Sequence, residues 1–184
     1  MIILGLDVST STTGYAFLDQ CGNLLEMGYI PLAKQKELTM KGKIFSNWLL
    51  EKKDQFNIDA VYIEEPFQRY SRGMSSARTI TRLAAFNGIV QYICLAHLDY
   101  IPGLISVSEA RKLSGIKTLS KKKAGKDVKE QVFEWVDSHL GYTWPTKVLQ
   151  SGPRKNQTII IPESRDMADA WVVANAGFVK LKNL

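Results

Sequence analysis

Long hydrophobic runs are absent from this sequence, and none of its apolar stretches approaches the ~20 residues that a membrane-spanning helix requires. The N-terminal run carries no basic leader and meets an acid at Asp7, so it predicts a buried strand rather than a signal peptide. Cysteine is scarce as well. Cys21 and Cys94 lack metal-type spacing, which predicts no disulfide framework and favours a reducing, cytoplasmic setting.

The composition is that of an ordinary globular protein with a basic balance. Hydrophobic residues make up 45% and charged residues 23% of the 184 residues, which suits one domain spanning 1–184. The formal net charge of +6 permits a polyanionic partner without requiring one. Three basic clusters suit a phosphate-backbone footprint: Lys121, Lys122, Lys123, Lys126 and Lys129; Arg69, Arg72, Arg78 and Arg82; and Arg154, Lys155 and Arg165.

Apolar patterning and turn residues predict an α/β fold. Strands are expected over residues 2–6, 14–18, 24–32, 60–63, 104–107 and 158–161. Helices are expected over residues 36–56, 75–97, 109–113, 123–140 and 166–182, the third of them capped by Ser108. Tight connections between the first three strands predict an antiparallel meander that begins a mixed sheet flanked by helices.

Four acidic residues stand at the ends of these predicted elements. Asp7 and Glu64 each follow an apolar strand, and the carboxyl ends of strands in an α/β sheet face the ligand crevice. Asp166 and Asp169 have i, i+3 spacing, which places both on one face of the last helix at its first turn. If that face looks toward the strand ends, all four carboxylates converge.

Converging carboxylates indicate a metal-dependent nuclease. Acids at this density repel one another, and hard divalent ions such as Mg²⁺ prefer carboxylate and water oxygens. Two such ions can activate water and stabilise the leaving oxygen of a phosphodiester. The basic clusters are then expected to hold the surrounding DNA backbone.

Each acid also has an alternative interpretation. Asp7 could simply end its strand, and Asp166 could be a helix N-cap or a first-turn acid, which taken alone is the better interpretation of that residue. Asp169 lies within an apolar stretch and is harder to explain structurally. Glu65 competes with Glu64, because alternation along a strand puts only one of them on the crevice side.

Together these segments resemble the RuvC family of Holliday-junction resolvases. Residues 5–9 with 13–16 resemble its first motif, and residues 63–67 resemble the second, an apolar strand ending in Glu. Asp166-Met167-Ala168-Asp169-Ala170 matches the terminal Asp-x-x-Asp-Ala motif. Residues 76–88 resemble the long helix that helps to form the family's dimer, and Lys129-Glu130-Gln131-Val132 resembles its Lys-x-Gln-Val segment.

The resemblance implies a ribonuclease H-like fold with a mixed five-stranded sheet and helices on both faces. It implies paired nicks across a four-way DNA junction, catalysed with Mg²⁺ or Mn²⁺, two ions per site, held by Asp7, Glu64, Asp166 and Asp169. It also implies a homodimer formed through the helix from Ser75 to His97. Lys129 would contact DNA near the cut, with Lys126 as the alternative, and Phe67 would stack on a junction base or pack in the core. The expected DNA-binding residues are Phe67, Arg69, Arg72, Arg78, Lys112, Lys121, Lys122, Lys123, Lys126 and Lys129.

The sequence departs from the family in two places. The stretch 115–129 is longer and richer in lysine than the usual loop, and residues 141–165 have no clear counterpart, so they could form a DNA-contacting hairpin or a spacer. These departures suggest a divergent, phage-type member that works without a branch-migration partner.

Three other functions remain open from the sequence. A nuclease of flaps, forks or other branched DNA would use the same residues. A DNA-binding protein without catalysis would not need all four acids. The turn from Asp7 to Gly14 also resembles the phosphate-binding hairpin of sugar kinases and actin-like ATPases, but 184 residues leave no room for their second nucleotide-binding half, so no nucleotide cofactor is expected.

Overall fold

The computed structural model describes residues 1–66 and 77–183. Phe67, Arg69 and Arg72, together with the predicted start of the second helix at Ser75, lie outside the described residues.

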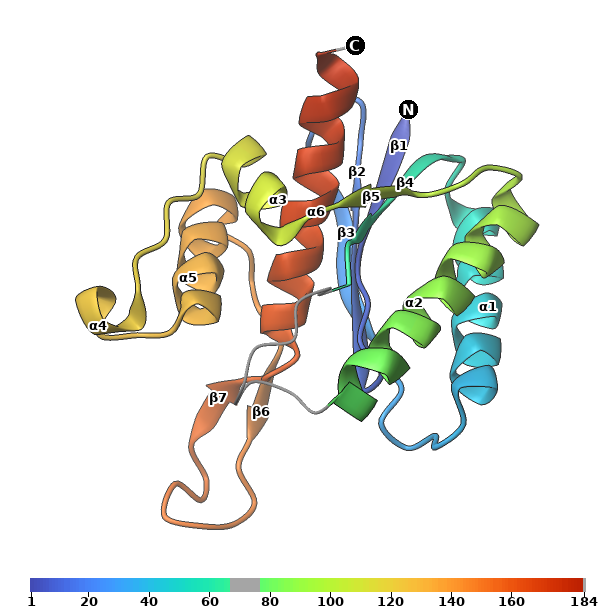
Figure 1. The fold of residues 1–184 in the computed structure, drawn as a ribbon. Coiled ribbons are helices and arrows are strands. Elements are labelled where there is room, and N and C mark those ends of the chain that lie inside the picture. Colours follow the sequence, from blue (N-terminus) through green and yellow to red (C-terminus); the bar gives the residue numbers. More distant parts are fainter. Residues whose placement is uncertain (67–76, 184) are drawn as a thin grey trace.

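A five-stranded mixed sheet forms the centre of the molecule, with strand order β3-β2-β1-β4-β5 (Figure 1). Strands β1, β2 and β3 form the predicted antiparallel meander, while β4 pairs parallel to β1 and β5 parallel to β4. The strand bounds are β1 Ile2–Asp7, β2 Thr12–Leu18, β3 Leu24–Pro31, β4 Ile58–Glu64 and β5 Gly103–Ile105. The sequence-based prediction of a mixed five-stranded sheet that starts with a meander is confirmed.

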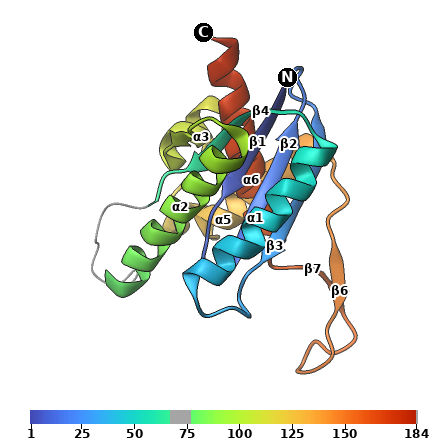
Figure 2. The same ribbon diagram turned by 90° about the vertical axis from the view of Figure 1, so that its right-hand side faces the viewer.

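Helices cover both faces of this sheet, as predicted (Figures 1 and 2). On one face, α1 (Leu38–Gln55) and α2 (Ala77–Leu98) bury Phe45 and Phe86 against Leu4 and Leu6 of β1. On the other face, α6 (Ser164–Lys182) lies against the sheet and packs with α3 (Val107–Leu113) and α5 (Val128–Leu140) around Ile3. Successive β1 side chains thus enter opposite cores, which explains why this strand is apolar throughout instead of alternating.

Two predictions about helices in the C-terminal half of the chain were wrong. Ser106, not Ser108, caps α3, because β5 already ends at Ile105 and the Ser106 hydroxyl accepts a hydrogen bond from the Glu109 amide at 3.2 Å. The helix expected over residues 123–140 is two helices, α4 (Lys121–Ala124) and α5. Gly125 ends α4 in a left-handed conformation with a φ of 73°, and Asp127 then caps α5.

The segment expected to contain one strand contains two. Strands β6 (Thr146–Val148) and β7 (Thr158–Ile160) form a separate antiparallel hairpin. It extends from the body at the end where α6 begins, away from the chain termini (Figure 1). The final helix begins at Ser164, two residues before the predicted start, so Asp166 lies inside its first turn and is not the N-cap.

In residues 1–66 and 77–183, no helix has both the length and the apolar character to cross a membrane.

Candidate active site

Two acids end neighbouring parallel strands. Asp7 is the last residue of β1 and Glu64 is the last residue of β4. The parallel register pairs Leu6 with Ile63, so the strands end side by side and point in the same direction. This part of the predicted geometry follows from the sheet alone, because parallel neighbours present their carboxyl ends at one edge.

Helix α6 brings Asp166 and Asp169 to the same edge by lying unusually close to the sheet. A Cβ atom at Gly14 of β2 would lie 2.5 Å from the Asp166 carbonyl carbon, and one at Gly5 of β1 would lie 2.5 Å from the Ala170 carbonyl oxygen. Both separations are far inside van der Waals contact. The two glycines therefore let the helix backbone rest on the strands, and they set the distance between its aspartates and Asp7.

The acids lie close enough to perturb one another. Burial raises the pKa of Asp7 well above its ordinary value, and the charges of Glu64 and Asp169 raise it further. Burial and the Asp169 charge raise the pKa of Glu64 from its ordinary 4.5 to about 7. Burial also raises the pKa of Asp169, against the opposing effect of Lys129. We call Asp7, Glu64, Asp166 and Asp169 the acidic cluster.

Lys129, in the first turn of α5, supplies positive charge to this cluster. Its Nζ atom lies 3.0 Å from Oδ1 of Asp166 and 3.3 Å from Oδ2 of Asp169. Burial acts to lower the pKa of Lys129, but the carboxylates of Asp169, Asp7 and Asp166 outweigh it and hold that pKa above its ordinary value. Lys126, the alternative left open by the sequence, forms an ion pair with Glu134 instead.

The charge of Glu64, the last residue of β4, acts on Asp7. Helix α2 helps to hold Glu64 in place, since the buried Asn87 side chain donates a hydrogen bond to the Glu64 carbonyl at 3.2 Å. Gln91 in turn donates to Asn87 at 2.7 Å. The Glu65 amide donates to the Ile105 carbonyl at 2.9 Å, which continues the β4–β5 pairing past Glu64.

The donor chemistry of the acidic cluster fits hard divalent cations, although its side chains do not already surround one point. Among the residues that the structure describes, no three His, Cys, Asp or Glu side chains are gathered as a ready set of metal ligands. Two of the carboxylates contact the Lys129 ammonium instead. Three partly buried acids nevertheless keep raised pKa values beside the cations of the protein itself, so bound divalent ions would stabilise their ionised forms, and oxygen donors are those that Mg²⁺ and Mn²⁺ prefer.

Sequence reasoning did not place Arg111 at this site. Its positive charge acts to lower the pKa values of Glu64 and Asp169, so the guanidinium lies within electrostatic range of the cluster. Together with Lys112 and Lys117, it lines a hollow of about 390 Å³ beside α3. The adjacent Lys112 was the residue of this helix that was expected to bind DNA. The sequence does not distinguish the two, because neighbouring residues of a seven-residue helix could each be the one that faces the site.

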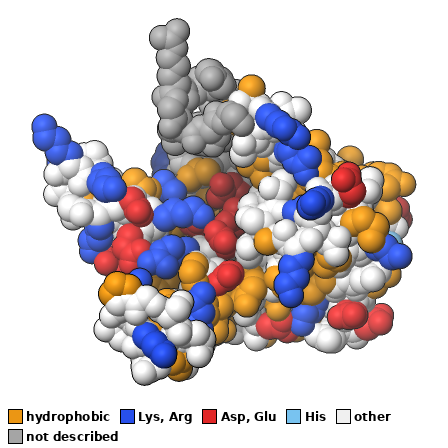
Figure 3. All heavy atoms as spheres, turned by 90° about the horizontal axis from the view of Figure 1, so that it is seen from below, with side chains coloured by type: hydrophobic (Ala, Val, Ile, Leu, Met, Phe, Trp, Pro, Cys, Tyr) orange, Lys and Arg blue, Asp and Glu red, His pale blue; other side chains and the backbone are white. Residues whose placement is uncertain are grey.

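Five other expected DNA-binding residues, all within the described part of the chain, are exposed. Lys121, Lys122 and Lys123 are exposed on α4, Arg78 is exposed in the first turn of α2, and Lys112 is exposed at the end of α3. Viewed from the end of the molecule where α6 begins, acidic side chains lie in a hollow with lysine and arginine side chains around it (Figure 3).

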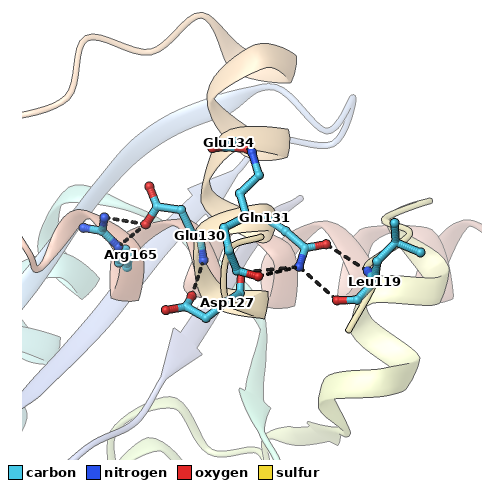
Figure 4. A network of polar contacts seen from close by, with 7 residues as sticks. Leu119, Asp127, Glu130, Gln131, Glu134 and Arg165 are labelled. Atoms are coloured by element: carbon cyan, nitrogen blue, oxygen red, sulfur yellow. Dashed lines mark hydrogen bonds and ion pairs between the residues drawn. The ribbon is translucent and has the colours of Figure 1, made fainter. Parts of the chain in front are cut away.

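The Gln131 side chain of α5 contacts both ends of the lysine segment, residues 119–127 (Figure 4). Gln131 accepts a hydrogen bond from the Leu119 amide at 2.8 Å and donates to the Leu119 carbonyl at 2.9 Å and the Lys126 carbonyl at 3.2 Å. It thus joins both ends of the segment that carries α4. Glu130 accepts a hydrogen bond from Arg165 Nε at 2.9 Å, which links α5 to the start of α6.

No protein-family model and no curated protein sequence matches the chain. Solved structures do resemble it. The Thermus thermophilus RuvC structure is 20% identical with a TM-score of 0.60, over 100% of this chain and 97% of that one. The T. thermophilus RuvC in complex with a Holliday junction substrate is 17% identical with a TM-score of 0.64, over 100% of this chain and 96% of that one.

The yeast mitochondrial Holliday junction resolvase is 18% identical with a TM-score of 0.52, over 98% of this chain and 80% of that one. At such low identity these likenesses concern the fold. The chain therefore has the ribonuclease H-like fold of the RuvC-type resolvases.

Proposed function

We propose that this chain is a metal-dependent endonuclease that resolves four-way DNA junctions by hydrolysing paired phosphodiesters. The observation that supports this most strongly is the acidic cluster. Asp7 and Glu64 lie at the carboxyl ends of two parallel strands and Asp169 lies on α6; all three are partly buried acids with raised pKa values, and Lys129 lies beside them. The fold is shared with a RuvC that was solved on a Holliday junction substrate.

Asp7, Glu64, Asp166 and Asp169 would hold Mg²⁺ or Mn²⁺, with two ions in each site. Divalent ions at such a site supply the charge that activates water and stabilises the leaving oxygen. The protein's own contribution is to hold these carboxylates against their mutual repulsion on rigid elements, the ends of β1 and β4 and the first turns of α6. Because α6 rests directly on Gly5 and Gly14, the cluster has little freedom to spread.

Lys129 and Arg111 are the cations that act on the cluster. Lys129 contacts two of its aspartates, while Arg111 acts on Glu64 and Asp169 from α3. With divalent ions bound to the acids, both cations would be available to the phosphate next to the cut. Lys129 is 54% exposed in its side chain, which allows it to turn toward such a phosphate.

The surrounding basic residues would hold the DNA backbone. Lys121, Lys122 and Lys123 project from α4, and Gln131 fixes the segment that carries them. Lys112 and Arg78 extend this basic surface on α3 and α2. Phe67, Arg69 and Arg72 remain proposed DNA contacts from the sequence alone.

A homodimer would place two such sites on one junction, and α2 is the proposed contact. The helix exposes Ala84, Ala85 and Gly88 together with Tyr92 and Leu95, which are 70% and 40% exposed. A Cβ atom at Gly88 would meet nothing within 4 Å, so a second helix could approach closely there. An apolar strip of small residues is typical of helix pairs with close backbones.

The test is a cleavage assay with a synthetic four-way junction in Mg²⁺, beside duplex, flap and fork controls of matched sequence. We expect paired nicks in the junction and little cutting of the duplex. Asp7→Asn should abolish cutting while leaving junction binding intact, because the lost charge serves the metal rather than the DNA phosphates. Equal cutting of flaps and forks would indicate a broader nuclease of branched DNA, and full cutting by the variant would refute the assignment of the site.

A further inference from the structure

The hairpin of β6 and β7, residues 145–161, carries charge of only one sign. Lys147, Arg154 and Lys155 are its charged residues, and it contains no Asp or Glu. All three basic residues are exposed. In a protein with 18 acidic residues, a protruding element without any of them favours an anionic partner.

The base of the hairpin is anchored in the core. Trp144 and Ile161, at its two ends, are only 7% and 8% exposed. Trp144 donates a hydrogen bond to Asp137 of α5 at 2.7 Å and packs on Phe133 with ring centroids 4.7 Å apart. The Ile161 amide donates to the Pro145 carbonyl at 3.0 Å. The hairpin therefore leaves the body in a fixed direction.

The tip of the hairpin is closed by its own backbone. The Leu149 amide donates to the Gln157 carbonyl at 3.0 Å, and the Asn156 amide donates back to the Leu149 carbonyl at 2.8 Å. Asn156 and Gly152 adopt left-handed conformations, with φ values of 66° and 79°. With a strand rise of about 3.3 Å per residue, four residues from Pro145 place Leu149 about 13 Å beyond the base. Such a structured hairpin argues against a simple spacer.

The base of the hairpin is connected directly to the helix that carries two acids of the acidic cluster. Strand β7 runs through Ile161 directly into α6, whose first turn carries Asp166. The hairpin projects at the same end of the molecule, opposite the chain termini (Figure 1). It arises from a different part of the chain than α4, so a phosphate backbone held at the cluster could meet basic residues on both elements.

We infer that the β6–β7 hairpin is a second DNA-binding element, which contacts the phosphate backbone of one arm of the branched substrate through Arg154 and Lys155 at its tip. This rests on the proposed function, because it supposes that branched DNA occupies the acidic cluster. The contacts are to phosphates and so add affinity without sequence preference.

Arg154→Ala combined with Lys155→Ala tests this inference by the salt dependence of junction binding, measured by fluorescence anisotropy in Ca²⁺ or EDTA. The logarithmic slope against salt should fall by about 0.9 for each phosphate that the protein no longer neutralises, or about 1.8 for the pair. When the salt rises from about 50 to 200 mM, the fold-decrease in junction affinity should then be about 12 times smaller for the variant than for the wild type. Its single-turnover cleavage at saturating protein should match the wild type, since neither residue touches the cluster.

The matched control is Lys53→Ala with Lys182→Ala. These lysines lie in the last turns of α1 and α6, far from the hairpin, and remove the same charge. The control should keep the wild-type slope. An unchanged slope in the tip variant, as expected if the tip contacts a protein instead of DNA, would overturn the inference. An equal fall in the control, or weaker binding of the tip variant without a change in slope, would overturn it as well. Wild-type protein that neither binds nor cuts a junction would instead refute the proposed function itself.

Discussion

Removing the ionisable group of Glu64 should change how the stability of the protein depends on pH. Its pKa is about 7 in the folded protein, against an ordinary 4.5, because burial and the Asp169 charge oppose its ionisation. Below pH 4.5 both the folded and unfolded chains hold the proton. Between pH 4.5 and 7 the unfolded chain releases it while the folded chain retains it, so the free energy of unfolding falls as the pH rises.

The shift corresponds to about 3 kcal/mol, at about 1.4 kcal/mol for each pKa unit. Glu64→Gln keeps the shape of the side chain but cannot ionise, so this pH-dependent destabilisation should disappear. In metal-free buffer, the free energy of unfolding of the wild type should therefore fall by about 3 kcal/mol more than that of Glu64→Gln between about pH 4.5 and 8.

Urea unfolding followed by tryptophan fluorescence, in EDTA at half-unit steps of pH, measures this difference. Adding Mg²⁺ at about pH 8 should restore stability to the wild type more than to Glu64→Gln, because the ion binds the ionised cluster only in the folded state. If the free energies of unfolding of the two proteins changed with pH in parallel, the claim that burial and neighbouring carboxylates raise the pKa of Glu64 would be refuted.

Three further predictions concern the packing of α6, the charge of Lys129 and the proposed dimer contact on α2. Gly14→Ala should push the start of α6 away by about 1 Å and reduce cleavage about 100-fold. Gly42→Ala, which crowds Ile89 on the opposite face of the sheet, should destabilise without this reduction in single-turnover assays. Lys129→Met should raise the pKa values of Asp169 and Glu64 and shift the acidic limb of the pH–rate profile upward by about one unit; an unshifted limb would contradict it. Gly88→Arg should leave a 20.7 kDa monomer at micromolar concentration, whereas a dimer in sedimentation would remove α2 from the interface.

The sheet was predictable because its signals are local. An apolar run with buried residues on both faces identified β1, and turn residues after β2 identified the meander. The strand ends then located Asp7 and Glu64, and i, i+3 spacing located Asp166 and Asp169. Alternation left Glu64 and Glu65 as competitors, which only the packing of β4 against its neighbours could separate.

What the sequence left open depends on contacts between distant segments. Gly5 and Gly14 resemble ordinary strand glycines until α6 is placed on them. Arg111 acts on the cluster only because α3 packs beside α6. The break at Gly125 was overlooked because the lysine-rich residues around it continue a helical pattern, although a glycine followed by the N-cap Asp127 is a recognisable pair of helix-end signals.

Manganese binding tests the central claim most directly, because it is independent of substrate choice. Electron paramagnetic resonance titration of the wild type with Mn²⁺ should show bound ions that Mg²⁺ displaces, and Asp7→Asn should lose them while still unfolding cooperatively in a thermal melt. Equal Mn²⁺ binding by the two proteins, or none by the wild type, would contradict a metal site built on the acidic cluster.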